Sequence, residues 1–285
     1  MLASAGVYAV PFAVTLGMTG LVRWVAGAER AGQFVGLALP LGFLVAWAVI
    51  VAPGWHAYDS LGRIGHVVFG AALAGFALDF WRPRRGFAIA ILLAFVAGSS
   101  WAEANGGLWP QARPDAAVLL SLVVSAVLGA ALAWRIDRLQ DADVPTGAPG
   151  AAILVLLMMI ALTFAAIAAV STDAALQATG LLLALAIAGY LTWIWITGAP
   201  LPAAAVCPAA AGLFALAWAL VARDAATIPG LALAGLILFA DGTARRVPLP
   251  RARISGLLYP LILAGVALLP MVLAAAVTLG LRRGG

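Results

Sequence analysis

Charged side chains are scarce in this sequence, and lysine is absent altogether. Only 9% of the 285 residues are charged, all 16 basic residues are arginine, and 65% of the chain is hydrophobic. A soluble domain carries roughly 25% charged residues, so the composition excludes that class. A mean hydropathy of +1.10 indicates instead that a lipid bilayer is the solvent in which the chain folds.

Side chains that bind metals are equally few. Cys207 is the only cysteine, which excludes an internal disulfide and a thiolate metal site, and its apolar surroundings favour a buried packing role. The two histidines, His56 and His66, are ten residues apart, a spacing that does not place them one or two turns apart on one helix face. The sequence therefore predicts no metal, no haem and no other cofactor.

Several catalytic and binding motifs are missing too. The sequence has no Gly-rich phosphate loop, no nucleophile elbow and no paired-aspartate signature. No ionisable side chain falls at the centre of an apolar run, which disfavours a proton-coupled pump or a cation antiporter. No basic patch is interleaved with aromatic residues, so we expect no nucleic acid partner.

The sequence does contain a series of apolar runs of about the 20 residues that a helix needs to cross a bilayer. They are approximately 5–22, 33–52, 62–79, 87–104, 116–134, 150–170, 176–197, 203–222, 226–240 and 256–280. These runs predict an all-α, polytopic transmembrane helical bundle of about ten spans, beginning with a retained helix rather than a cleaved signal peptide. The polar stretch 135–149 is typical of a linker, here a cytoplasmic one, and divides the chain into two blocks of five helices, 1–134 and 150–285.

Arginine collects in the odd-numbered loops between these runs. Elsewhere it occurs at Arg63, Arg113 and Arg223 in even-numbered loops, and at Arg282 and Arg283 near the C-terminus. Because translocation of positive charge is disfavoured, the pattern places the odd-numbered loops in the cytoplasm and both termini outside, with the C-terminal pair as the exception. The bias toward arginine, alanine and glycine is typical of GC-rich bacterial sequences, so we expect a multi-pass protein of the bacterial inner membrane.

Seven ionisable residues are predicted to share the outer face of the first block. They are His56, Asp59, Arg63, His66, Glu103, Arg113 and Asp115. One interpretation is a water-facing pocket in which Arg63 and Arg113 receive an anionic headgroup or small solute, while His66 or Glu103 transfers a proton. The other is a set of ordinary interfacial charges, with one surface salt bridge and a histidine at the membrane boundary.

Part of this cluster resembles a known family. Asp59 to His66, then Glu103, then Arg113 and Asp115 before a helix with Gly129, are similar in order to the acid/histidine, glutamate and arginine/aspartate residues of VanZ-like membrane proteins. The resemblance covers about 70 residues. The spacing from Asp59 to His66 is longer than in that family, and the asparagine that commonly follows its last aspartate is absent, so the chain is not assigned to it.

Two arginine clusters lie in the odd-numbered loops of the two blocks. They are Arg82, Arg84 and Arg85, and Arg245, Arg246, Arg251 and Arg253. Such clusters bind anionic lipid headgroups or an acidic partner, but the positive-inside signal that fixes topology is sufficient to account for them.

The leading functional prediction follows from the arrangement of the spans. Five helices per block would give the blocks inverted topology, as in many secondary transporters, and prolines within spans such as Pro208 and Pro260 mark places where helices can break. We therefore expect a permease or flippase-like carrier for a small or lipid-linked substrate, with the bilayer and its anionic lipids as partners. Two alternatives stay open: an accessory or assembly subunit that packs against other membrane subunits, and a membrane enzyme that acts on a lipid headgroup at the external face.

Overall fold

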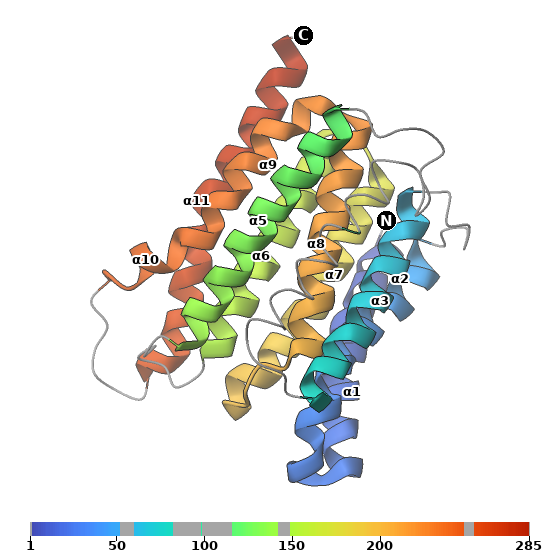
Figure 1. Ribbon diagram of the computed structural model, residues 1–285, viewed down its shortest axis with the longest axis vertical. Helices are drawn as coiled ribbons and strands as arrows, with labels where there is room; N and C mark the ends of the chain where they lie inside the picture. The colour runs from blue at the N-terminus through green and yellow to red at the C-terminus, as the bar shows by residue number, and fades with distance from the viewer. Residues whose placement is uncertain are drawn as a thin grey trace.

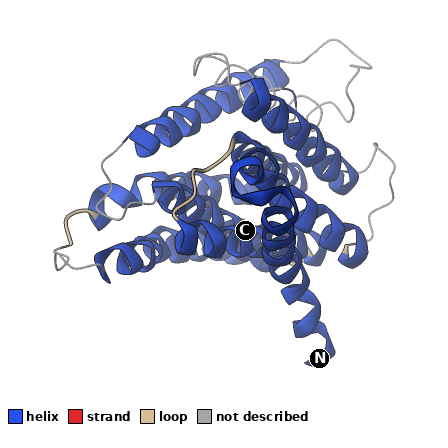
Figure 2. Ribbon diagram, turned by 90° about the horizontal axis from the view of Figure 1, so that it is seen from below, coloured by secondary structure: helices blue, strands red, loops and turns tan. Residues whose placement is uncertain are grey.

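The computed structural model describes residues 2–51, 60–81, 98, 116–141, 149–247 and 254–284. Within these residues the chain is 93% helical and contains no strand, which confirms the predicted helical bundle. Figure 1 shows the long helices running roughly side by side, and Figure 2 views the same bundle from below.

The described residues of the first half of the chain form one helical hairpin and two further long helices. They are α1 (Leu2–Phe34), the 3-10 segment η1 (Val35–Leu37), α2 (Ala38–Ile50), α3 (Ser60–Trp81) and α5 (Ala116–Asp141). Within α1 the chain turns back at Gly27, whose φ of 74° and ψ of 165° are not helical. A side chain is strained at that φ, whereas glycine adopts it freely, so Gly27 marks the boundary between the first two predicted spans.

The described residues of the second half of the chain form five long helical stretches. They are α6 (Pro149–Val170), α7 (Ala174–Thr197), α8 (Ala203–Arg223), a composite of η2 (Ala225–Thr227), α9 (Ile228–Ala234), η3 (Gly235–Phe239) and α10 (Ala240–Ala244), and α11 (Ile254–Gly284). Pro208 lies inside α8, and Pro260 and Pro270 lie inside α11, without ending either helix. These prolines therefore do not create half-helices in the described structure.

Helices α6, α7 and α8 form the centre of the bundle. They are the most buried of the long apolar helices, whereas α1 and α11 are largely exposed. In Figure 1, α11 lies at one edge and α1 to α3 at the other; α11 packs on α6, α1 packs on α7, and α3 packs on α8. Helices from the first half of the chain thus pack directly onto helices from the second half.

Gly75 allows α3 to approach the backbone of α8 closely. A Cβ atom at this position would lie 2.5 Å from the carbonyl oxygen of Ala203 and 2.8 Å from the Cα atom of Ala204. Lipid tails are as apolar as the side chains of a membrane helix, so burial of apolar surface does not drive such helices together. Small residues at a crossing let the helices approach closely and gain van der Waals contacts instead.

The Gly75→Ala substitution is expected to lower the free energy of unfolding by about 2 kcal/mol, because the added methyl group meets backbone atoms that cannot rotate away. Reversible SDS titration of the purified protein measures this change. Gly265→Ala is the matched control: it lies within α11 and its Cβ would meet nothing within 4 Å, so it should be neutral or slightly stabilising. Equal effects of the two substitutions would contradict the close α3–α8 packing.

Among the described residues, seven helical stretches are long and apolar enough to cross a bilayer, which fits a multi-pass membrane protein. Every predicted run except the fourth, 87–104, overlaps described helical residues along most of its length; the fourth lies outside them apart from Gly98. Two shorter apolar stretches, 35–50 and 126–136, correspond to the second and fifth predicted runs. The structure therefore supports the bundle and seven candidate spans.

Candidate functional site

Polar contacts join helices at both ends of the bundle, and the first group lies where α7 ends and α8 begins. There the guanidinium of Arg23, near the end of the first predicted span, lies 5.6 Å from the ring centre of Trp193 near the end of α7. At the same end, Asp79 of α3 accepts hydrogen bonds from the backbone N–H groups of Ala203 and Ala204, each 2.8 Å long. These contacts bring together the ends of helices that the sequence placed beside odd-numbered loops.

A second interhelical contact at this end joins α5 to the composite ninth stretch. The guanidinium of Arg135 forms an ion pair with Asp241, and its Nε donates to the carbonyl oxygen of Leu238 over 2.9 Å. It also lies 5.6 Å from the ring centre of Phe239, while Arg245 approaches the other carboxylate oxygen of Asp241 at 3.5 Å. Asp241 is only 2% exposed, so these two arginines offset a buried charge where the 3-10 segment ends.

A depression with a volume of about 680 Å³ lies at the opposite end of the bundle. It lies where α6 ends, α7 begins, α8 ends and α11 approaches its own end. Its walls combine charged groups, hydroxyls and leucines; the lining residues are Ser171, Thr172, Asp173, Ala174, Leu176, Leu220, Arg223, Asp224, Ala226, Leu281 and Arg282. We refer to these residues as the end-face pocket.

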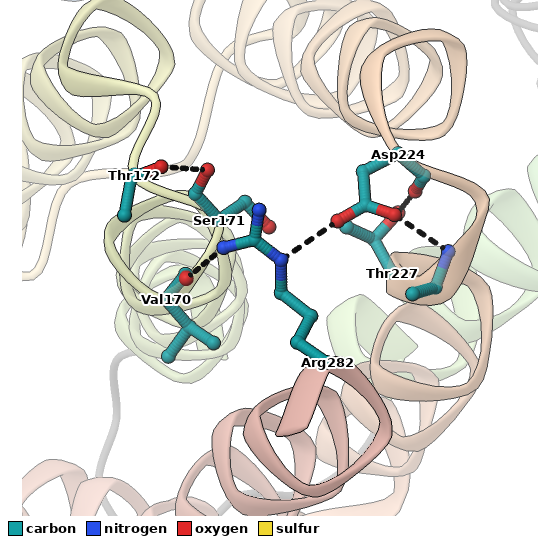
Figure 3. Close-up of polar contacts among 7 residues, drawn as sticks. Val170, Ser171, Thr172, Asp224, Thr227 and Arg282 are labelled. Atoms are coloured by element: carbon teal, nitrogen blue, oxygen red, sulfur yellow. Dashed lines mark hydrogen bonds and ion pairs between the residues drawn. The ribbon is translucent and has the colours of Figure 1, made fainter. Parts of the chain in front are cut away.

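Arg282 links two walls of the end-face pocket (Figure 3). Its Nη1 donates to the carbonyl oxygen of Val170 over 2.5 Å, and its Nε lies 3.2 Å from Oδ2 of Asp224. Asp224 is fixed in turn, because its Oδ1 accepts from the backbone N–H of Ala226 over 3.0 Å, while its carbonyl oxygen accepts from the hydroxyl of Thr227 over 2.7 Å. The C-terminal helix is thereby tied to the turns after α6 and α8.

The facing wall is built from the turn between α6 and α7. Asp173 caps α7: its Oδ1 accepts from the backbone N–H of Leu176 over 3.0 Å, and its Oδ2 lies 3.7 Å from Nη1 of Arg223. Thr172 has a φ of 59°, a left-handed value that is rare for a β-branched residue, and its hydroxyl donates to the carbonyl oxygen of Ser171 over 2.7 Å. This tight turn places a serine, a threonine and an aspartate at the rim of the pocket.

The charges in the end-face pocket are paired but accessible to solvent. The side chains of Arg223 and Arg282 are 52% and 35% exposed. Exposed ion pairs contribute little net free energy, typically about 0–1 kcal/mol, so a ligand can compete with them at small cost. The arrangement can therefore exchange internal pairs for contacts with a charged ligand.

The structure tests little of the polar cluster predicted on the outer face of the first block. Arg63 and His66 lie on α3, where Arg63 is partly buried, His66 is exposed, and Nδ1 of His66 is 2.8 Å from the carbonyl oxygen of Gly62. The other members lie outside the described residues; they are His56, Asp59, Glu103, Arg113 and Asp115. Whether the seven residues meet stays a prediction.

The two predicted arginine clusters are described only in part. Arg245 has the protein partner Asp241, and Arg246 is exposed beside it. The remaining members lie outside the described residues; they are Arg82, Arg84, Arg85, Arg251 and Arg253.

No sequence pattern indicated that the residues of the end-face pocket lie together, although its charged residues are present in the sequence. Asp173, Arg223 and Arg282 all fall beside even-numbered loops or the tail, which share one side in the predicted topology. Their position on one predicted side of the membrane is the sequence feature that could have indicated the pocket.

Among the described residues, no group of three or more histidine, cysteine or acidic side chains is placed to hold a metal ion. Comparison of the chain with known protein families, curated proteins and solved structures finds no match.

Proposed function

We propose that this protein is a permease or flippase-like carrier for a small or lipid-linked substrate, and that the end-face pocket receives the polar part of that substrate. The observation that carries the proposal is a depression of about 680 Å³ at the ends of α6, α7, α8 and α11, lined by two arginines and two aspartates. Ligand pockets are typically about 300–1,000 Å³ in volume, so the space suits a headgroup or a small solute.

The walls of the pocket support a substrate that is partly apolar. Leu176, Leu220 and Leu281 line it beside the charged groups, and each belongs to a helix that is long and apolar enough to cross the bilayer. A lipid-linked substrate could keep its chains along these apolar helices while its headgroup exchanges with the ion pairs. Such a substrate requires a pocket at the membrane boundary that has both charged and apolar walls.

We further propose ten spans in a bacterial inner membrane, with the arginine-rich end of the bundle in the cytoplasm. Support for a fourth span over 87–104 comes from its neighbours, since α3 ends at the lower end of Figure 1 and α5 begins at the upper end. Support for the orientation comes from the positive-inside rule. Cysteine-accessibility labelling at Ala174 and Arg246, which are both exposed and are each changed to cysteine in a Cys207→Ala background, should modify the first from outside and the second only from inside.

Reconstitution into liposomes tests the carrier proposal. Vesicles with a fluorescent anionic lipid analogue in both leaflets are treated with a membrane-impermeant quencher, and a carrier makes the inner-leaflet probe accessible. We expect wild-type protein to do so, Arg282→Gln to slow the rate about tenfold, and Arg283→Gln to leave it unchanged, because Arg283 does not line the pocket.

Protection of the inner leaflet equal to that in protein-free vesicles, together with a partner chain co-purifying at fixed stoichiometry, would favour the accessory-subunit alternative. The enzyme alternative depends on different residues and predicts that Glu103→Gln abolishes turnover of a lipid headgroup while leaving the fold intact.

A further inference from the structure

The end-face pocket contains more hydrogen-bond donors than its own carboxylates use. A guanidinium carries five N–H donors. In the described part of the chain, Arg282 engages Nε and Nη1 with Asp224 and Val170, and its Nη2 makes no hydrogen bond. Arg223 makes a single contact there, at 3.7 Å from Asp173, and its side chain is more than half exposed. Two guanidinium groups therefore retain donors at one pocket.

The carboxylates of the pocket are less available than the guanidiniums. One oxygen of Asp173 accepts from the backbone N–H of Leu176 at the start of α7, and one oxygen of Asp224 accepts from the backbone N–H of Ala226. The second oxygen of each faces an arginine. Since acceptors are already occupied and donors are in excess, the pocket favours a ligand that brings acceptors and negative charge.

Hydroxyl groups add to this excess of donors. Oγ of Ser171 is buried and has no hydrogen-bond partner among the described residues, although Ser171 lines the pocket. A tetrahedral oxyanion satisfies guanidinium and hydroxyl donors together, and arginine binds phosphate oxygens through parallel N–H groups.

We propose that the end-face pocket binds a phosphate group between Arg223 and Arg282, with Ser171 as a further donor. The phosphate belongs either to an anionic lipid headgroup or to a free phosphate ion, and both present the same oxygens to the pocket. Basic pockets between membrane helices on the cytoplasmic side bind anionic lipid headgroups, and the same kind of donor lines the pocket at this end of the bundle. The inference deepens the proposed function, on which it rests for the idea of a substrate, by naming the chemical class of the group received.

Two binding assays on the full-length protein test the proposal and separate the two sources. Equilibrium dialysis of the detergent-purified protein against radiolabelled inorganic phosphate at low salt measures binding of the free ion. Incorporation into nanodiscs of phosphatidylcholine with a minor share of phosphatidylglycerol, followed by quantification of lipid retained after detergent exchange, measures binding of the headgroup. Wild type, Arg282→Gln and Arg223→Gln are compared with the matched control Arg283→Gln in both assays.

We expect saturable binding in at least one assay, weakened about tenfold or more by Arg282→Gln and by Arg223→Gln but not by Arg283→Gln. Binding in the dialysis identifies free phosphate as sufficient, and retention of phosphatidylglycerol alone identifies the lipid as the source. Arg223→Gln keeps the test valid if Arg282→Gln fails to fold, because the Arg223 pair is longer and more exposed.

Absence of binding in both assays, or equal losses for all three arginine variants, would overturn the proposed site. Its failure is distinguishable from failure of the carrier proposal: pocket-dependent binding without flux of the group that is bound rejects only the carrier, and flux without pocket-dependent binding rejects only the site.

Discussion

Replacing Asp79 with alanine is expected to lower the free energy of unfolding by about 3 kcal/mol, because two charge-assisted hydrogen bonds between helices are lost together. Both oxygens of this carboxylate accept from the first two N–H groups of α8, each over 2.8 Å. Pro202, which precedes α8, provides no side-chain cap, so these donors depend on α3. Reversible SDS titration of the purified protein gives the change in free energy.

Two further variants separate this role of Asp79 from ordinary capping. Asp79→Asn keeps one carbonyl acceptor and should fall between wild type and Asp79→Ala. Asp173→Ala removes the cap on the N–H of Leu176 together with a longer, solvent-exposed pair with Arg223, and should cost about 1 kcal/mol. If Asp79→Ala cost no more than Asp173→Ala, Asp79 would not join α3 to α8.

Removing Arg135 is expected to have an effect of similar size at the same end of the bundle. Arg135→Met should lower the free energy of unfolding by about 3 kcal/mol, since Asp241 would remain buried and Arg245, at 3.5 Å, would be its remaining ion-pair partner among the described residues. The carbonyl oxygen of Leu238 would also lose its donor. The same SDS titration measures the change.

A double mutant shows whether the buried charge is the cause. Asp241→Leu in the Arg135→Met background removes the unpaired carboxylate and should recover part or all of the loss, because apolar replacement of a buried pair is often neutral. Arg138→Met is the control; Arg138 is exposed and lies over the ring of Trp134, so its loss should cost at most about 0.5 kcal/mol. A double mutant no more stable than Arg135→Met would contradict this explanation.

Much of the helical architecture could be predicted because membrane helices follow from local composition. The predicted runs 150–170, 176–197 and 203–222 agree closely with α6, α7 and α8, since each is a long apolar stretch ended by polar or Pro/Gly-containing turns. In the described bundle Arg135 meets Asp241 at one end and Arg282 meets Asp224 at the other. Which end faces the cytoplasm stays a prediction.

The end-face pocket could not be predicted from local composition. Its charged residues come from turns separated by about fifty residues or more in sequence, and only the packing of α6, α8 and α11 brings Asp173, Asp224 and Arg282 to one place. Arg282 lies outside the odd-numbered loops in which arginine collects. In the structure it contacts two acceptors, the carbonyl oxygen of Val170 and Oδ2 of Asp224. The contact between Asp79 and α8 could not be predicted for the same reason, because its partners at the start of α8 are 124 and 125 residues away in sequence.

The intact mass of the particle purified in mild detergent or nanodiscs tests the central claim most directly, because a free-standing carrier needs no companion chain. We predict a particle that contains this chain alone or in copies of itself, with a phosphate-bearing lipid whose retention falls in Arg282→Gln and not in Arg283→Gln. A stoichiometric partner chain, with no lipid retained through the end-face pocket, would contradict the carrier and identify the protein as a subunit of a larger membrane complex.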